Sequence, residues 1–208
     1  MFSFLFFRCC DIITKYQNKI CREVQIMELG EKTLASELIF DGWLLKLYRA
    51  EVGLPDGGRS AREYVHHPGG AAVVALDGDG NVYLERQFRY PYRKVVVEIP
   101  AGKLEEGEDP FDAIRRELKE EIGATAGRWD SLGYIMPSVG YTDEMLYLYL
   151  ARDLTFGETH WDKDECLEPF KLPFAEALER AADGRINDGK TVSALFRAER
   201  LMRGETDG

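Results

Sequence analysis

The stretch GKLEEGEDPFDAIRRELKEEIGA, residues 102–124, carries the most information about the fold of this chain. From residue 111 onward, apolar side chains recur at steps of three and four, the spacing of one helix face; they are Phe111, Ile114, Leu118 and Ile122. Asp109 is a residue type that caps helix N-termini, Pro110 suits a first turn, and Gly123 is a natural stop. The stretch therefore predicts a loop followed by a helix over residues 109–122.

The same helix carries three glutamates on one face. Glu117, Glu120 and Glu121 stand at i, i+3 and i+4, where neighbouring Cβ atoms are roughly 5–6 Å apart. Like charges at this spacing repel one another, and a hard divalent cation with oxygen ligands offsets that repulsion. Basic residues of the helix also offset part of it, and an acidic run alone is typical of a solvated surface. Because the helix has its own apolar face and follows a predicted buried strand, we expect the glutamates to lie against a sheet edge.

The segments around this helix predict a sheet whose strands mostly precede the helices. Apolar patterns predict one or two strands over 36–52 and further strands over 62–66, 71–76, 82–88, 95–99, 131–135, 145–151 and 167–172. Asp77-Gly-Asp-Gly80 predicts a tight hairpin turn, and Pro100-Ala-Gly102 predicts a break after a buried strand. Two helices, over 174–182 and about 191–202, follow the last strand. This order predicts an α+β fold with a mixed sheet.

Composition and charge exclude several other classes of protein. The 208 residues are 45% hydrophobic and 31% charged, as in an ordinary globular domain, and the formal net charge of −10 disfavours a nucleic-acid partner. No run approaches the roughly 18 apolar residues of a membrane span, so no membrane partner is expected. Three of the four cysteines lie within the first 21 residues, which excludes a disulfide framework and favours a cytoplasmic location.

The spacing of Gly102, Glu108 and the run Arg116-Glu-Leu-Lys-Glu-Glu-Ile-Gly123 resembles the Nudix box. Only the last position departs from that pattern, because Ala124 stands where a bulkier aliphatic residue is usual. The resemblance implies a Nudix fold, in which a mixed β-sheet is sandwiched between helices (α/β/α), here with an N-terminal antiparallel β arm. It also implies a hydrolase of nucleoside diphosphates linked to another group. By position, Arg116 would orient the glutamates of the helix and Glu108 would pair with Arg116.

The resemblance also implies a metal site. Glu117 and Glu121 would be metal ligands together with the carbonyl oxygen of Ala101, and Glu120 would be a further ligand or an acid beside the metal. The implied cofactor is Mg²⁺, with Mn²⁺ as an alternative. The physical logic does not depend on the family, because pyrophosphate oxygens repel an incoming hydroxide and magnesium neutralises that charge and acidifies bound water.

Four further segments resemble the ADP-ribose pyrophosphatase branch, and the similarity spans about residues 38–200. They are Gln87-Phe-Arg-Tyr-Pro91, Glu98-Ile-Pro-Ala-Gly-Lys103, Pro137-Ser-Val-Gly-Tyr-Thr-Asp-Glu144 and Asp183-Gly-Arg-Ile-Asn-Asp-Gly-Lys-Thr191. In the third segment, Val139 stands where the branch has a proline, and this is a departure from the branch pattern. The resemblance implies hydrolysis of ADP-ribose to AMP and ribose 5-phosphate, or of a related nucleoside diphosphate sugar. The alternative is a Nudix-like sensor domain that binds ADP-ribose or another nucleotide without cutting it.

Within these segments the resemblance implies further site residues. Glu144, on a loop that can move toward the substrate, is expected to be the general base, with Glu120 as the competing candidate. Arg89 is expected to contact the diphosphate, because a guanidinium suits paired phosphate oxygens. Glu98 ends a buried strand and is expected to bind ribose or to pair with an arginine. Arg62 matches a position near which relatives hold the diphosphate.

The remaining expectations concern aromatic residues and domain organisation. Trp43 and Tyr92 could stack on adenine, although both are more often core or dimer contacts. We expect a non-essential extension over 1–26, a dimerising β arm over 27–66 and the hydrolase domain over 67–204, because the resembling enzymes are dimers. Gly189-Lys-Thr191 ends like a phosphate-binding loop, but no glycine-rich loop precedes it, so we expect it to cap the last helix.

Overall fold

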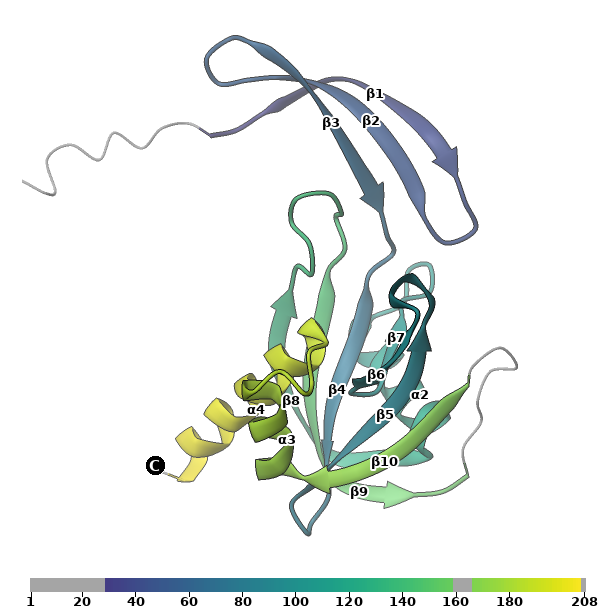
Figure 1. Cartoon of the computed structure of the whole chain (residues 1–208), viewed down its shortest axis with the longest axis vertical. Coiled ribbons are helices and arrows are strands. Elements are labelled where there is room, and N and C mark those ends of the chain that lie inside the picture. Colours follow the sequence, from purple (N-terminus) through teal and green to yellow (C-terminus); the bar gives the residue numbers. More distant parts are fainter. Residues whose placement is uncertain (1–28, 159–165, 207–208) are drawn as a thin grey trace, which may run out of the picture. The chain divides into compact units, whose positions relative to one another are not determined.

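The structure is a computed structural model that describes residues 29–158 and 166–206 (Figure 1). The chain divides into two compact units: one holds the described residues up to Glu37 together with Arg49–Arg62, and the other holds Leu38–Tyr48 and everything from Glu63 onward. The predicted extension over 1–26 lies outside the described residues.

The N-terminal strands form a three-stranded antiparallel sheet in the order β1-β2-β3. Its strands are β1 (Lys32–Asp41), β2 (Lys46–Gly53) and β3 (Arg59–His66). The sequence left open whether 36–52 is one strand or two, and the structure has two, with a turn closed by the Gly42 N–H and the Leu45 carbonyl at 2.9 Å. The antiparallel β arm expected at this end of the chain is therefore present.

The second sheet is mixed and has seven strands. They are β4 (Gly70–Leu76), β5 (Asn81–Arg89), β6 (Lys94–Glu98), β7 (Ala101–Lys103), β8 (Ala124–Ile135), β9 (Leu146–Phe156) and β10 (Leu167–Pro173). The main order is β10-β5-β4-β9-β8, with β6 paired to β5 and β7 to β4. Strands β4 and β9 pair in parallel and the other pairs are antiparallel. A mixed sheet of this kind confirms the predicted fold class.

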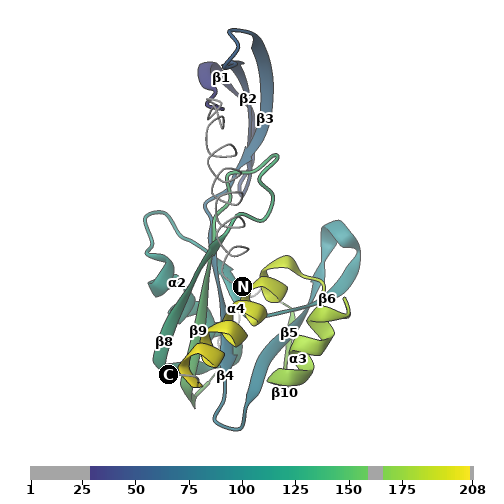
Figure 2. The same cartoon turned by 90° about the vertical axis from the view of Figure 1, so that its left-hand side faces the viewer.

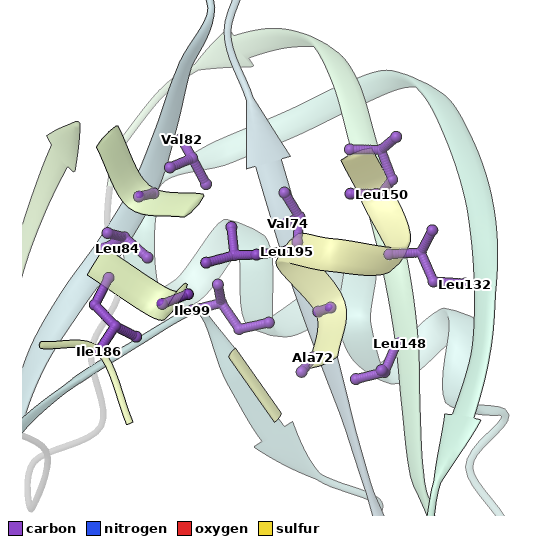
Figure 3. Close-up of a cluster of buried hydrophobic side chains, with 14 of the residues drawn as sticks. Ala72, Val74, Val82, Leu84, Ile99, Leu132, Leu148, Leu150, Ile186 and Leu195 are labelled. Atoms are coloured by element: carbon purple, nitrogen blue, oxygen red, sulfur yellow. The ribbon is translucent and has the colours of Figure 1, made fainter. Parts of the chain in front are cut away.

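Helices cover both faces of this sheet: α2 (Pro110–Ile122), α3 (Phe174–Ala182) and α4 (Gly189–Thr206) (Figure 2). Successive side chains of a strand point to opposite faces, and β4 follows this rule. Its residues Ala71, Val73 and Ala75 pack with α2, whereas Ala72 and Val74 join the core under α3 and α4. Figure 3 shows the second of these cores around Leu195 of α4. Within the described residues, no helix is both long and apolar enough to cross a membrane.

Some expected boundaries were wrong. The break expected at Pro100-Ala-Gly102 is present only at its start, at Pro100, because Ala101–Lys103 form strand β7, which pairs with β4. Strand β8 begins at Ala124, seven residues before the expected start, and the paired β9 extends correspondingly to Phe156. A short 3₁₀ turn, Tyr90–Tyr92, follows β5. Tertiary pairing thus extends strands whose own sequence has no clear alternation.

Candidate active site

Helix α2 presents its glutamates through the local signals that the sequence contains. Asp109 caps the helix by accepting the Phe111 N–H at 2.8 Å, and Gly123 ends it in the left-handed conformation at φ 66°. Between these ends, Glu117 and Glu121 are 8% and 2% exposed, so two charged residues are carried on the packed side of the helix. Burying carboxylates costs free energy unless a partner compensates their charge, so their partners decide what the site can do.

Arg116 is the centre of a group that we call the Arg116 cluster, made of Arg116, Glu108, Glu117 and Glu120. Its Nε and Nη2 atoms both lie 3.1 Å from the carboxylate oxygens of Glu108, an arrangement with two parallel bonds. Its Nη1 atom donates to Glu117 Oε1 at 2.8 Å and to Glu120 Oε2 at 3.0 Å. One guanidinium therefore fixes three carboxylates, as expected for a residue that orients the glutamates.

The bonds within this cluster shift the pKa values of its members. Hydrogen bonds from Arg116 and from the backbone N–H of Glu105 hold the pKa of Glu108 below its ordinary value. The bonds to Glu108 and the neighbouring charges raise the pKa of Arg116. Both groups are therefore ionised at neutral pH, and the cluster holds three carboxyl groups around one guanidinium.

The backbone of the segment before the helix lies close to the buried carboxylates. The Ala101 N–H donates to Glu121 Oε2 at 3.1 Å, which places this peptide beside the buried Glu121. Gly102 lies so close to Glu117 that a Cβ atom there would be 1.8 Å from Oε1 of Glu117. Any side chain at position 102 would push the Glu117 carboxylate out of its place, so glycine is required for Glu117 to keep this position.

The chemistry of this donor set suits a hard divalent cation. All candidate ligands are oxygens, namely the carboxylates of Glu117, Glu120 and Glu121 and the carbonyl of Ala101. In residues 29–158 and 166–206, no three acidic, histidine or cysteine side chains converge as a metal cluster. Arg116 binds two of the carboxylates and the Ala101 N–H binds the third, so their present geometry is set by these positive groups. A cation would compete with them for the same oxygens, and the residues fit that role.

A second group, the Glu98 cluster, joins Glu98 to Arg89, Lys190 and Asp188. Arg89 grips Glu98 through two bonds, Nε to Oε1 at 2.7 Å and Nη2 to Oε2 at 2.6 Å. Lys190 also donates to Glu98 Oε2 and lies 3.1 Å from Asp188. Burial alone would raise the pKa of Glu98, but the bond from Arg89 and the charge of Lys190 outweigh it and lower the pKa. Of the two roles expected for Glu98, pairing with an arginine is the one observed.

Several members of this region were not identified from the sequence. Lys190 and Asp188 lie in the closing segment that resembles the ADP-ribose pyrophosphatase branch. Their place in this segment was the only feature of the sequence that pointed to a role in the site. Asp188 accepts both the N–H and the hydroxyl of the buried Thr191, so Asp188 caps α4 and the expected role of Gly189-Lys-Thr191 is only partly right. The Thr191 hydroxyl also accepts the Ile99 N–H at 3.0 Å, which ties α4 to the end of β6.

Glu144 lies in the loop between β8 and β9, where its side chain is 26% exposed. Its N–H donates to the Thr142 hydroxyl at 3.2 Å, and its Oε1 atom lies 3.6 Å from Nδ1 of His67. The preceding residue, Asp143, contacts both His66 and the backbone of His67. Neither histidine was predicted to be part of the site, although the loop segment itself was.

The other predicted residues have different surroundings. Arg62 belongs to the first compact unit, where its guanidinium binds both carboxylate oxygens of Glu31. Trp43 is 91% exposed, and the ammonium of Lys103 lies 5.3 Å from the centre of its ring. Tyr92 ends the 3₁₀ turn after β5 and is 73% exposed. The roles predicted for these three residues in substrate binding stay predictions.

Comparisons with known proteins identify the family of this chain. A family model described as the NUDIX domain matches residues 66–195. A protein of Bacillus subtilis (strain 168) named ADP-ribose pyrophosphatase is 40% identical over 169 residues, 80% of this chain and 91% of that protein. A Bacillus methanolicus protein named methanol dehydrogenase activator is 42% identical over 167 residues, 79% of this chain and 90% of that protein.

A solved structure described as the crystal structure of an ADP compounds hydrolase resembles the fold. It has a TM-score of 0.75 and 23% identity, and the match covers 86% of this chain and 97% of that one. The family model covers more than half of the chain, and the relatives are similar over most of their length. The chain therefore belongs to the Nudix family of hydrolases.

Proposed function

We propose that this protein hydrolyses the pyrophosphate bond of ADP-ribose and releases AMP and ribose 5-phosphate. The observation that carries the proposal is the pair of buried carboxylates, Glu117 and Glu121, held against the backbone of Ala101 and Gly102 by close packing. The relative from Bacillus subtilis, named for this activity, supports the choice of substrate. Other nucleoside diphosphate sugars share the diphosphate on which this site would act.

Divalent metal is used by Nudix ADP-ribose pyrophosphatases, and we propose Mg²⁺ as the metal here, with Mn²⁺ as a substitute. Glu117, Glu121 and the Ala101 carbonyl would hold it, with Glu120 as a further ligand. Bound magnesium would supply charge neutralisation for the diphosphate and an acidified water. Arg116 keeps the carboxylates oriented for that role through its bonds to Glu117 and Glu120.

The hydrolytic step needs a group that removes a proton from the attacking water. We assign this role to Glu144, with Glu120 as the alternative. As the water oxygen bonds to phosphorus, its proton passes to the glutamate and the bridging P–O bond breaks, leaving two phosphate monoesters. A general base must come within about 2.6–3.2 Å of the proton-bearing oxygen, and a loop residue can close that distance when substrate binds.

Three residues are proposed to contact the substrate, and Glu98 is proposed to complete the binding site by positioning one of them. Arg89 would contact the diphosphate while Glu98 holds its Nε and Nη2 atoms in place. Arg62 would supply a second guanidinium after exchanging its bond to Glu31 for phosphate oxygens. The exposed face of Trp43 is suited to stacking on adenine.

A substrate panel tests the proposed reaction. The purified protein is incubated with Mg²⁺ and ADP-ribose, GDP-mannose, UDP-glucose or a dinucleoside diphosphate, and the products are identified by mass. We expect AMP and ribose 5-phosphate from ADP-ribose at the highest kcat/KM, with ¹⁸O from labelled water in only one of the two. Tight binding of ADP-ribose without magnesium-dependent products would instead establish the sensor that the sequence left as the alternative.

We further propose a cytoplasmic homodimer formed through the N-terminal arm. Strand β1 and the turn after it expose apolar side chains, including Phe40 at 60% and Trp43 at 91%. Exposed large apolar side chains gathered on one strand and its turn are a feature of interaction sites. Light scattering of the wild type and of Phe40→Ser tests the dimer; equal, monomeric masses would contradict it.

The exposed thiol of Cys166 is compatible with the reducing compartment proposed for the protein.

A further inference from the structure

The loop that carries Glu144 is attached to the segment Val65–His67, which is the end of β3 and the residue after it. The Val65 N–H donates to the Tyr141 carbonyl at 2.8 Å, and the Asp143 N–H donates to the Val65 carbonyl at 3.2 Å. These two bonds form a parallel bridge between Val65 and Thr142. The loop connects β8 to β9, and β3 belongs to the other sheet, so this attachment is additional to the pairing within either sheet.

Asp143 strengthens this attachment with its side chain. Its Oδ2 atom lies 2.7 Å from Nδ1 of His66, and its Oδ1 atom accepts the His67 N–H at 3.0 Å. Both oxygens are therefore used on consecutive residues of the same segment. Burial alone would raise the pKa of Asp143, but these two bonds outweigh it and lower the pKa, so the carboxylate is charged at neutral pH.

Glu144 follows Asp143 directly, and its carboxylate faces the segment that Asp143 holds. Glu144 Oε1 is 3.6 Å from Nδ1 of His67, whose side chain is 13% exposed. The same Nδ1 atom accepts the Gly69 N–H at 3.1 Å, which fixes the orientation of the imidazole ring. The imidazole ring of His67 therefore limits where the Glu144 side chain can lie, and the backbone N–H of His67 is in turn bonded to Asp143.

We propose that Asp143 is a positioning residue for the general base, Glu144. Its bonds to His66 and His67 hold the loop that carries Glu144 in place. The proposal rests on the assignment of Glu144 as base in the proposed function. A base misplaced by about 1 Å can lose roughly 10²-fold in rate, so one pinned loop residue can control turnover without touching the substrate. Loss of the Asp143 bonds to His66 and His67 should lower kcat and leave KM little changed.

The test is a double-mutant cycle on kcat with ADP-ribose and Mg²⁺, using Asp143→Ala, Glu144→Gln and the double variant. We expect Asp143→Ala to lower kcat about 10- to 100-fold. In the Glu144→Gln background the same change should have little further effect, because there is no base left to position. Asp143→Asn retains an oxygen acceptor for the His67 N–H and should keep an intermediate rate.

Two further variants separate positioning from general stability. Asp77→Ala removes a carboxylate with similar contacts, to the Asn81 N–H at 2.8 Å and to Lys171 at 3.1 Å, from the hairpin at the opposite end of β4. It should lower the melting temperature without lowering kcat. His66→Ala removes only one of the two contacts of Asp143, at a side chain that is 51% exposed. It should fold normally and give a smaller loss of kcat that also vanishes in Glu144→Gln.

The outcomes distinguish this inference from the proposed function. If Glu144→Gln is slow but the effect of Asp143→Ala is unchanged in that background, Asp143 does not act through Glu144 and the inference is overturned. The same holds if Asp143→Ala and His66→Ala both turn over at the wild-type rate. If Glu144→Gln itself keeps the wild-type rate, the assignment of the base fails first, while magnesium-dependent hydrolysis by the wild type would still support the reaction.

Discussion

The Arg116 cluster and the Glu98 cluster are both built around a guanidinium that binds a carboxylate through two bonds. They differ in the balance of charge. In the first, one cation holds three carboxylates, and in the second, Arg89 and Lys190 face Glu98 and Asp188. A surplus of negative charge favours a further cation, whereas a balanced group is complete by itself. The comparison indicates that the first cluster is arranged to bind a cation, whereas the charges of the second cluster already compensate one another.

The two clusters also differ in how they are anchored. The carboxylates of the Arg116 cluster are held on one helix and the loop before it, through Glu108, Glu117 and Glu120. The Glu98 cluster joins a strand end to the start of α4, residues 92 positions apart in the sequence. Breaking the first should therefore affect catalysis most, and breaking the second should affect stability most.

The largest effect is expected from Glu121→Gln. The amide keeps the size of the side chain but removes the charge that a metal requires. We expect a loss of kcat at least as large as the roughly 10²–10⁴-fold that removal of a general base costs, with an unchanged far-ultraviolet spectrum. The matched control is Asp112→Asn, an exposed carboxylate on the same helix, which should keep the wild-type rate. A Glu121→Gln variant near the native rate would show that the metal assignment is wrong.

A smaller loss is expected from Arg116→Lys, which keeps the charge but not the planar fork. Lysine can donate to one carboxylate at a time, so Glu108, Glu117 and Glu120 would no longer be held together. Loss of a group that orients metal ligands typically costs about 10- to 100-fold in affinity or activity, and the Mg²⁺ dependence of kcat measures it. Arg115→Lys, at the exposed neighbouring position, is the control. Equal Mg²⁺ dependence in the two variants would contradict the orienting role.

The second cluster predicts a loss of stability in Glu98→Gln. The carboxylate is 2% exposed, and without it Arg89 loses both of its bonds to Glu98 while Lys190 keeps only Asp188. Breaking a buried charge pair costs about 3–5 kcal/mol; since Arg89 is 40% exposed, we expect the lower end of this range in urea unfolding. Glu168→Gln, at a surface pair on β10 with Arg86, should change stability little. Comparable losses of stability in the two variants would contradict the larger stabilising contribution assigned to the buried Glu98.

The smallest effect is expected in how the stability difference between the wild type and Glu98→Gln changes with pH. The pKa of Glu98 is lowered in the folded protein, so its stabilising contribution is complete above the ordinary glutamate pKa of about 4.3. It is lost as the pH falls through the lower, folded pKa. The stability difference between wild type and Glu98→Gln should therefore be constant near neutral pH and shrink below about pH 4. A difference that grows on acidification would contradict the assigned direction.

Much of the Arg116 cluster could be predicted from the sequence because its parts are local. The cap at Asp109, the stop at Gly123 and the spacing of the glutamates all lie within one helix and follow from its periodicity. The Glu98 cluster could be predicted only in part. Glu98 was expected to bind ribose or to meet an arginine, but Lys190 and Asp188 come from another element, and no local pattern indicates that contact.

The sequence by itself determined the elements whose signals repeat along a short stretch: the acidic helix, the hairpin at Asp77–Gly80 and the mixed α+β character of the fold. Only the tertiary structure decided which distant residues meet, such as Asp143 with His66 and His67, and that Ala101–Lys103 pair with β4 as strand β7. The physical reason is that capping and periodicity act over a few residues, whereas contacts between loops depend on how the sheet brings separate segments together.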